Sequence, residues 1–241
     1  VWRGQNGSMI EQRIIDDFAE DTTAVEIGEN VNLPISGFPE KPEVAALADG
    51  GHVVAWMAQG SANPDTANYG IYLQRYDASG DKVGAAVLVN TTTNGAQYYP
   101  GVAGLDDGSY VVVWQSDTGS DGSNWGIYSQ RFTTNGVKTG GEVLVNTITA
   151  SEQRDASVTA LANGGYVITW TGDNAGNGST EVYARIFQAN GTAIASEFVV
   201  NTITAGDQIT HGQIAETVTG LAGGRFAVTF VDNNDADGSE T

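Results

Sequence analysis

The chain has 241 residues, contains no cysteine, and carries a formal net charge of −19 from 29 acidic and 10 basic residues. The lack of cysteine excludes disulfides and thiolate metal sites, and no stretch is long and apolar enough to span a bilayer. The acidity, with no basic stripe, disfavours nucleic acid and anionic membranes as partners. Cations, glycans and basic proteins remain open as partners.

One pattern recurs along the chain at intervals of 54–60 residues, and an aromatic residue marks each copy. These aromatic residues are Trp2, Trp56, Trp114, Trp170 and Phe230. A period in this range indicates repeated supersecondary units. The repeat units are approximately 1–42 (partial and degenerate), 43–100, 101–156, 157–216 and 217–241 (partial). The chain begins and ends inside the pattern, so we expect a single repeat domain, 1–241, that is part of a longer chain.

Each copy predicts four short antiparallel strands. In the copy that the others follow, these strands are Val102 to Leu105, Tyr110 to Trp114, Ile127 to Phe132, and a fourth that ends at Asn146. Between the first two strands, Asp107-Gly108-Ser109 supplies the positive φ of a tight hairpin turn. The β-branched and aromatic residues of the second strand favour a pleated, buried surface.

Four antiparallel strands in a repeat of this length are typical of a β-propeller blade. The alternative is an elongated row of small β-sandwiches, but each sandwich of about 100 residues would need two repeats. We therefore predict an all-β, propeller-like array of about four four-stranded blades. Trp56, Trp114, Trp170 and Phe230 should occupy equivalent buried positions in it.

The loops after the second strands are rich in oxygen ligands. Asn233, Asp235 and Asp237 precede Gly238 with the alternating spacing of calcium loops. Related loops add three further candidate metal ligands: Asp117, Asp121 and Asp173. The alternative interpretation is that Asp, Asn, Gly and Ser are simply the residues that hairpin tips require. Both interpretations stay open, and calcium is the one cofactor that the sequence suggests.

Four aromatic residues lie in or beside predicted loops rather than at the repeated strand positions. They are Tyr69, Tyr98, Tyr99 and Trp125. Aromatic faces next to Asn, Asp and Gln side chains are the chemistry of sugar recognition, so these residues are our candidate ligand-binding site. The alternative is that Trp125, which comes directly before a strand, packs over the hairpin.

Catalytic residues are harder to find in the sequence. His52 replaces the Tyr or Phe of the other copies, so it is interpreted as a packing residue, and His211 lies in a loop insertion. No nucleophile-elbow motif occurs. Paired carboxylates for glycoside hydrolysis are compatible with 29 acidic residues, but no pair stands out.

The repeat resembles a family of known sequences. Ala46 to Trp56, Gly126 to Phe132 and the Val-Asn-Thr-x-Thr segment at 145–149 are similar to tandem repeats of very large secreted bacterial surface proteins, including those with RTX-type tails exported by type I secretion. The similarity covers about residues 43–210. It implies an extracellular, cell-surface segment with a propeller-like fold and an adhesive or scaffolding role, and it implies no catalytic residues.

From these observations we expect a non-catalytic, extracellular recognition or scaffold segment that binds a glycan, a protein or another segment of the same polypeptide, with calcium as the candidate stabilising ion. One alternative is a propeller-type glycoside hydrolase, which would need convergent acids and clustered arginines. Arg75, Arg131 and Arg154 are dispersed evenly along the repeats and argue against it. The other alternative is a structural spacer, which would show no aromatic cluster.

Overall fold

The computed structural model describes residues 2–3, 10–11, 39–59, 69–119, 125–173, 179–202, 206–210 and 217–232. Apart from one short 3-10 turn, the regular structure of these residues is β-strand. No helix in the described ranges is long and apolar enough to cross a membrane. The all-β class predicted from the sequence is confirmed.

Three successive sheets each contain four antiparallel strands in chain order. The first sheet contains β3 (Pro39–Ala46), β4 (His52–Gln59), β5 (Tyr69–Tyr76) and β6 (Lys82–Leu88). The second contains β7 (Gln97–Gly104), β8 (Tyr110–Ser116), β9 (Gly126–Phe132) and β10 (Lys138–Leu144). The third contains β11 (Gln153–Ala160), β12 (Tyr166–Asp173), β13 (Thr180–Phe187) and β14 (Phe198–Val199). We call these sheets blades 1, 2 and 3.

The remaining described strands form smaller antiparallel pairs. β1 (Trp2–Arg3) pairs with β2 (Ile10–Glu11). β15 (Gln208–Ile209) pairs with β18 (Val231–Asp232). β16 (Val218–Leu221) pairs with β17 (Arg225–Val228), and the turn η1 (Ala222–Gly224) joins them.

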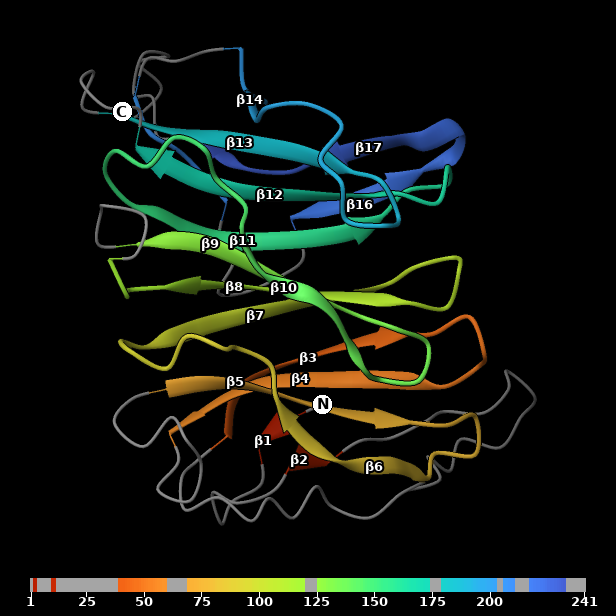
Figure 1. The fold of residues 1–241 in the computed structure, drawn as a ribbon. Helices are drawn as coiled ribbons and strands as arrows, with labels where there is room; N and C mark the ends of the chain where they lie inside the picture. Colours follow the sequence, from red (N-terminus) through yellow and green to blue (C-terminus); the bar gives the residue numbers. More distant parts are fainter. Residues whose placement is uncertain are drawn as a thin grey trace, which may run out of the picture.

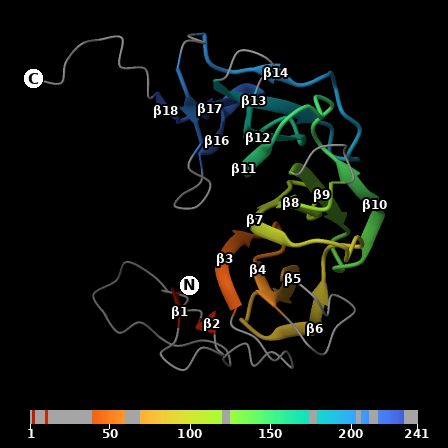
Figure 2. The ribbon, with the colours of Figure 1, turned by 90° about the vertical axis from the view of Figure 1, so that its left-hand side faces the viewer.

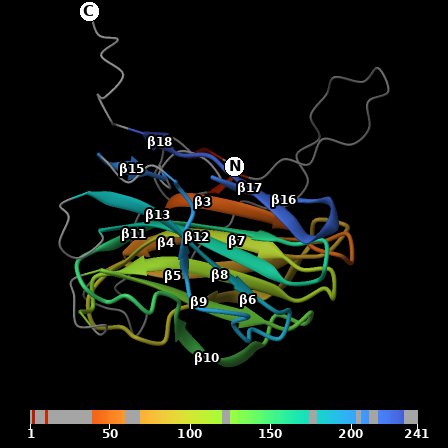
Figure 3. The same ribbon diagram turned by 90° about the horizontal axis from the view of Figure 1, so that it is seen from above.

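The blades are arranged radially. Their strands run roughly alongside one another in successive layers (Figures 1 and 3). Seen from the side in Figure 2, the first strands β3, β7, β11 and β16 lie on the inner side of a curved array, and β6, β10 and β14 lie on its outer side. This arrangement confirms the predicted propeller-like array, because each small sheet packs its faces against its neighbours.

A tryptophan occupies the centre of each blade. Trp56, Trp114 and Trp170 are at most 1% exposed. Each lies on the second strand, and its ring stacks at 6.0–6.3 Å on the Tyr ring opposite it on the third strand. The prediction of equivalent buried tryptophans is therefore confirmed for the three full blades. Full burial of a large side chain contributes about 1.5–3 kcal/mol in each case.

The fourth predicted position, Phe230, is an exception. Its side chain is 39% exposed, and it lies beyond the end of β17. In the described part of the chain, β17 pairs with β16 alone, so no third strand supplies the ring that covers each tryptophan. The prediction of a buried Phe230 is wrong because burial at this position requires a partner strand on both sides.

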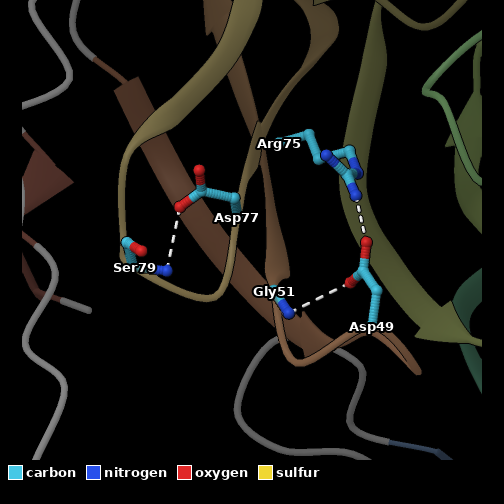
Figure 4. Close-up of polar contacts among 5 residues, drawn as sticks. All are labelled: Asp49, Gly51, Arg75, Asp77 and Ser79. Carbon is cyan, nitrogen blue, oxygen red and sulfur yellow. Dashed lines mark hydrogen bonds and ion pairs between the residues drawn. The ribbon is translucent and has the colours of Figure 1, made fainter.

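The Asp-Gly turns form as the sequence indicates. In the turn between β3 and β4, Gly50 has φ of 84°, and the backbone N–H of Gly51 donates to Asp49 Oδ1 at 3.0 Å. Asp49 also forms an ion pair with Arg75 of β5, as Figure 4 shows. In the turn between β5 and β6, the N–H of Ser79 donates to Asp77 Oδ1 at 2.9 Å (Figure 4).

An Asn–Gln contact fastens each blade to the next and explains the Val-Asn-Thr-x-Thr motif. In blade 2, Asn146 Oδ1 accepts the N–H of Ile127 at 2.9 Å, and its Nδ2 donates to the Gln153 side chain at 3.1 Å. Asn90 with Gln97, and Asn201 with Gln208, repeat the contact at 3.0 and 3.2 Å. The asparagine thus binds its own third strand and the first residue of the following blade.

Candidate functional site

The inner strands start earlier than the sequence pattern predicts. β7 begins at Gln97 rather than Val102, and a break in its register with β8 lies between Tyr98 and Gly101. β3 and β11 carry the same irregularity, between Glu40 and Glu43 and between Arg154 and Ser157. Such a bulge bends the strand and turns a side chain to a new direction.

Each bulge holds a residue in the left-handed region of backbone space. Lys41, Tyr99 and Asp155 have φ of 51°, 53° and 56° and occupy the same place in blades 1, 2 and 3. A non-glycine residue in this conformation costs of order 1–3 kcal/mol, and such residues cluster at functional sites. The recurrence of this strain at one end of the inner strands directs attention to that end.

The four aromatic residues predicted to bind a ligand come together at this end. The ring of Tyr98 lies 5.3 Å from that of Tyr69, 6.0 Å from that of Tyr99 and 5.5 Å from that of Trp125. All four side chains are partly buried. Tyr69 is the first residue of β5, Tyr98 and Tyr99 lie on β7, and Trp125 directly precedes β9, so two blades build the cluster.

A hollow of about 230 Å³ lies beside this cluster. Its walls are formed by six residues: Tyr98, Tyr99, Gln115, Trp125, Arg154 and Asp155. The Arg154 guanidinium carbon lies 4.8 Å from the centre of the Trp125 ring, and Arg154 pairs with Glu152 at 2.6 Å. The hollow therefore combines aromatic faces, a cation, a carboxylate and an amide.

Asp155 is held firmly through its backbone. Its N–H donates to Gln115 Oε1 at 2.8 Å, and its carbonyl accepts the hydroxyl of Thr210 at 3.1 Å. Thr210 is held in turn by Thr171, whose Oγ1 accepts the Thr210 N–H at 2.8 Å. Gln115 of blade 2 and Thr210 of the segment after blade 3 thus fix the backbone of Asp155 without using its carboxylate in these contacts.

A second carboxylate contacts the aromatic cluster. The hydroxyl of Tyr69 donates to Glu40 Oε1 at 3.5 Å. Lys41, the next residue, places its ammonium 5.5 Å from the centre of the Tyr99 ring. Burial, followed by the charge of Asp117 and the neighbouring tyrosines, raises the pKa of Tyr98, so its hydroxyl stays protonated at neutral pH.

Three residues of the hollow were not among the sequence candidates: Gln115, Arg154 and Asp155. Gln115 lies in the middle of an apolar strand pattern, and its reach to the next blade depends on packing. Asp155 is one of 29 acidic residues. One feature of the sequence could have pointed to Asp155. It lies two residues after the repeated glutamine, and the repeat before it has Tyr99 at that position instead of an acid.

The predicted calcium ligands fall into two groups. Four of them lie outside the described residues: Asp121, Asn233, Asp235 and Asp237. Asp117 uses Oδ1 to accept the backbone N–H of Ala96, and Asp173 Oδ1 is buried without a hydrogen bond. Across the described ranges, no three acidic or histidine side chains are grouped to hold a metal ion. The calcium hypothesis stays a prediction.

His52 has the packing role expected of it. Its ring stacks on Tyr76 of the third strand at 4.8 Å with an interplanar angle of 2°. Tyr110 with Phe132, and Tyr166 with Phe187, stack in the same way at 5.0 Å. His211 lies outside the described residues.

No protein-family model and no curated protein sequence matches this chain. Among solved structures, the fold is similar to a family GH93 α-L-arabinofuranosidase of Fusarium graminearum in complex with arabinobiose, with a TM-score of 0.53, 13% identity, and coverage of 80% of this chain and 60% of that one. It is also similar to the Hadza microbial sialidase Hz136, with a TM-score of 0.51, 9% identity, and coverage of 81% and 42%. The chain thus spans less than two thirds of either protein.

These comparisons correct two expectations from the sequence. The expectation of a non-catalytic recognition or scaffold segment, and therefore of a protein that is not an enzyme, is wrong. The solved structures that share the fold are named as glycosidases. They favour the alternative of a propeller-type glycoside hydrolase. The three arginines remain apart in the structure: Arg154 lines the hollow, Arg75 pairs with Asp49, and Arg131 lies on β9 at another cavity. Identities of 9% and 13% establish the shared fold alone.

Proposed function

We propose that this chain is the propeller portion of a glycoside hydrolase and that the hollow beside Tyr98 binds the saccharide. The observation that carries the proposal is the convergence of Tyr98, Tyr99 and Trp125 with Arg154 and Asp155 around one hollow. A structural spacer has no need for such a cluster.

The lining suits a sugar ring. Aromatic side chains offer an apolar face with large area, and the C–H groups of a saccharide pack on such a face. The amide N–H groups of Gln115 and the guanidinium of Arg154 provide donors, and the Asp155 carboxylate provides acceptors, for the hydroxyl groups of a sugar. A few placed polar groups in a mostly apolar hollow are typical of small-molecule sites.

Two carboxyl groups flank the aromatic cluster, and glycoside hydrolysis uses a pair of them. One protonates the leaving oxygen, and the other activates water or attacks the sugar. We assign these roles to Asp155, which lines the hollow, and Glu40, which accepts the Tyr69 hydroxyl. Gln115 and Thr210 hold the backbone of Asp155 in place, and this limits the positions that its carboxylate can take beside a bound sugar.

The experiment is a screen of the purified chain on chromogenic glycosides, including arabinofuranosides, followed by Asp155→Asn and Glu40→Gln on any substrate that is cleaved. Loss of a general acid or base lowers kcat by about 10²–10⁴-fold. Asparagine tolerates the left-handed conformation of residue 155, so Asp155→Asn should leave the melting temperature unchanged.

Asp77→Asn is the matched control, because Asp77 lies in the turn after β5 and its Oδ1 accepts the backbone N–H of Ser79. It should retain full activity. Saccharide binding without hydrolysis would contradict the hydrolase proposal. Hydrolysis that survives Asp155→Asn would contradict the assignment of the catalytic carboxylate.

A further inference from the structure

A second cavity, of about 290 Å³, lies between blades 2 and 3. Its lining includes Arg131, Gly141, Val143, Tyr166, Phe187 and Asn190. The cavity and the hollow lie at opposite ends of strand β9. Trp125, at the hollow, directly precedes the strand, and Arg131, at the cavity, lies near its end. At about 3.3 Å per residue, the two sites are roughly 20 Å apart.

The lining of this cavity is rich in hydrogen-bond donors and contains no carboxylate. Asn190 uses Oδ1 to accept the N–H of Thr192 at 2.9 Å, which leaves its amide N–H groups for another acceptor. Burial raises the pKa of Tyr166 to about 12, against an opposing effect of the Arg131 charge, so Tyr166 keeps its hydroxyl proton at neutral pH. In a chain with a net charge of −19, an acid-free cavity around an arginine is unusual.

Blade 1 provides an internal comparison for Arg131. The equivalent Arg75 forms an ion pair with Asp49 (Figure 4). In blade 2, Ser109 stands where blade 1 has glycine, and its N–H and hydroxyl both donate to Asp107 Oδ1. The Arg131 guanidinium donates instead to the neutral Ser109 Oγ, at 3.4 Å. Within the described residues, Arg131 therefore has no carboxylate partner at ion-pair distance.

We propose that this cavity binds a small organic carboxylate, with its charged group on the Arg131 guanidinium. The planar fork of a guanidinium matches a carboxylate, and a single arginine balances a single negative charge. The stacked rings of Tyr166 and Phe187, together with Val143, offer an apolar wall to the organic part of the ligand. A uronic acid has this combination of a ring and one carboxylate. The site is separate from the hollow and does not depend on the proposed hydrolase activity.

Calorimetric titration of the whole chain with D-glucuronate tests the proposal, with D-glucose as the uncharged match and inorganic phosphate as the inorganic anion. Glucuronate should bind and raise the melting temperature, because a ligand that binds only the folded state stabilises it. Glucose should show no saturable binding. Tighter binding of phosphate than of glucuronate, or equal binding of glucose, would overturn the assignment of an organic carboxylate.

Arg131→Gln should weaken glucuronate binding at least about tenfold, equivalent to about 1.4 kcal/mol. Arg75→Gln, at the same place in blade 1, should leave the affinity unchanged, as should Trp125→Ala in the hollow. Unchanged affinity in Arg131→Gln would refute the site.

A second variant covers the case in which Arg131→Gln folds poorly. A Cβ at Gly141 meets nothing within 4 Å, and blade 1 carries Ala85 at the equivalent position, so Gly141 accepts a side chain. Gly141→Asp places a competing carboxylate at the cavity and should abolish glucuronate binding, whereas Gly141→Asn should retain more of it. Equal affinities of these two variants would contradict a role for charge.

Discussion

Oε1 of Gln115 accepts a 2.8 Å hydrogen bond from the backbone N–H of Asp155, so blade 2 holds the bulge of blade 3 in its left-handed conformation. The same relationship joins blade 3 to the segment after it, where Thr171 Oγ1 accepts the N–H of Thr210 at 2.8 Å. The residue that follows the buried tryptophan thus accepts a backbone N–H of the next segment in both places. In blade 1 that residue is Met57, which has no strong acceptor.

We predict that Gln115→Met, which copies blade 1, leaves the Asp155 N–H without its partner. Loss of a partner by a buried polar group costs about 1–3 kcal/mol, which urea denaturation will measure. Because Gln115 also lines the hollow, saccharide affinity should fall as well. Gln59→Met, at an exposed strand end, is the control and should change stability by less than about 0.5 kcal/mol. Equal effects of the two substitutions would contradict the supporting role.

The buried tryptophans give a second prediction. Trp114→Ala should destabilise the fold by about 3–5 kcal/mol, because it removes a fully buried ring that stacks on Tyr128. Phe230→Ala should cost far less, because that side chain is 39% exposed. Chemical denaturation of both variants measures the difference. A loss for Phe230→Ala as large as that for Trp114→Ala would mean that the fourth repeat buries its aromatic residue after all.

The sequence predicted the blades well because each second strand carries a strong local signal. A run of β-branched residues before Trp114, bounded by an Asp-Gly turn, leaves little choice of structure. The inner strands were predicted too short because the bulge after Tyr98 breaks the alternation of buried and exposed side chains. Tyr98 and Tyr99 therefore looked like loop residues, although they lie on β7.

The site was only partly predictable for a related reason. The aromatic candidates stood out because they depart from the repeat, and the structure brings them together. Arg154 and Asp155 did not stand out, because their importance comes from packing between blades, which connects residues 40 to 60 positions apart in the chain, as in the contacts of Gln115 and Thr210 with Asp155. A single sequence carries no local signal of such contacts.

The asparagine that links the blades gives a third prediction. Asn146→Ala removes the acceptor of the Ile127 N–H and the donor to Gln153, all of them buried. Two buried groups lose partners, so we expect a loss of more than about 2 kcal/mol in the free energy of unfolding. Asn94→Ala, at an exposed position, serves as the control. A small, equal effect at both positions would show that the Asn–Gln contact is not a structural requirement.

The last prediction concerns pH and His52. Burial lowers the pKa of His52 below its ordinary value of 6.5, and the nearby Asp77 opposes this effect only in part. As the pH falls through 6.5, the imidazole of the unfolded chain takes up a proton more readily than that of the folded chain. The unfolded state then binds more protons, so the free energy of unfolding decreases as the pH falls from about 7.5 to about 5.5.

His52→Tyr, which introduces the residue of blades 2 and 3, removes this titration and keeps a ring to stack on Tyr76. Its stability should therefore decrease less than that of the natural chain over the same pH range. Urea denaturation of both proteins at several pH values measures the two slopes, and any contribution from His211 is common to both. A variant whose stability falls as steeply as that of the natural chain would show that the acid sensitivity comes from other groups.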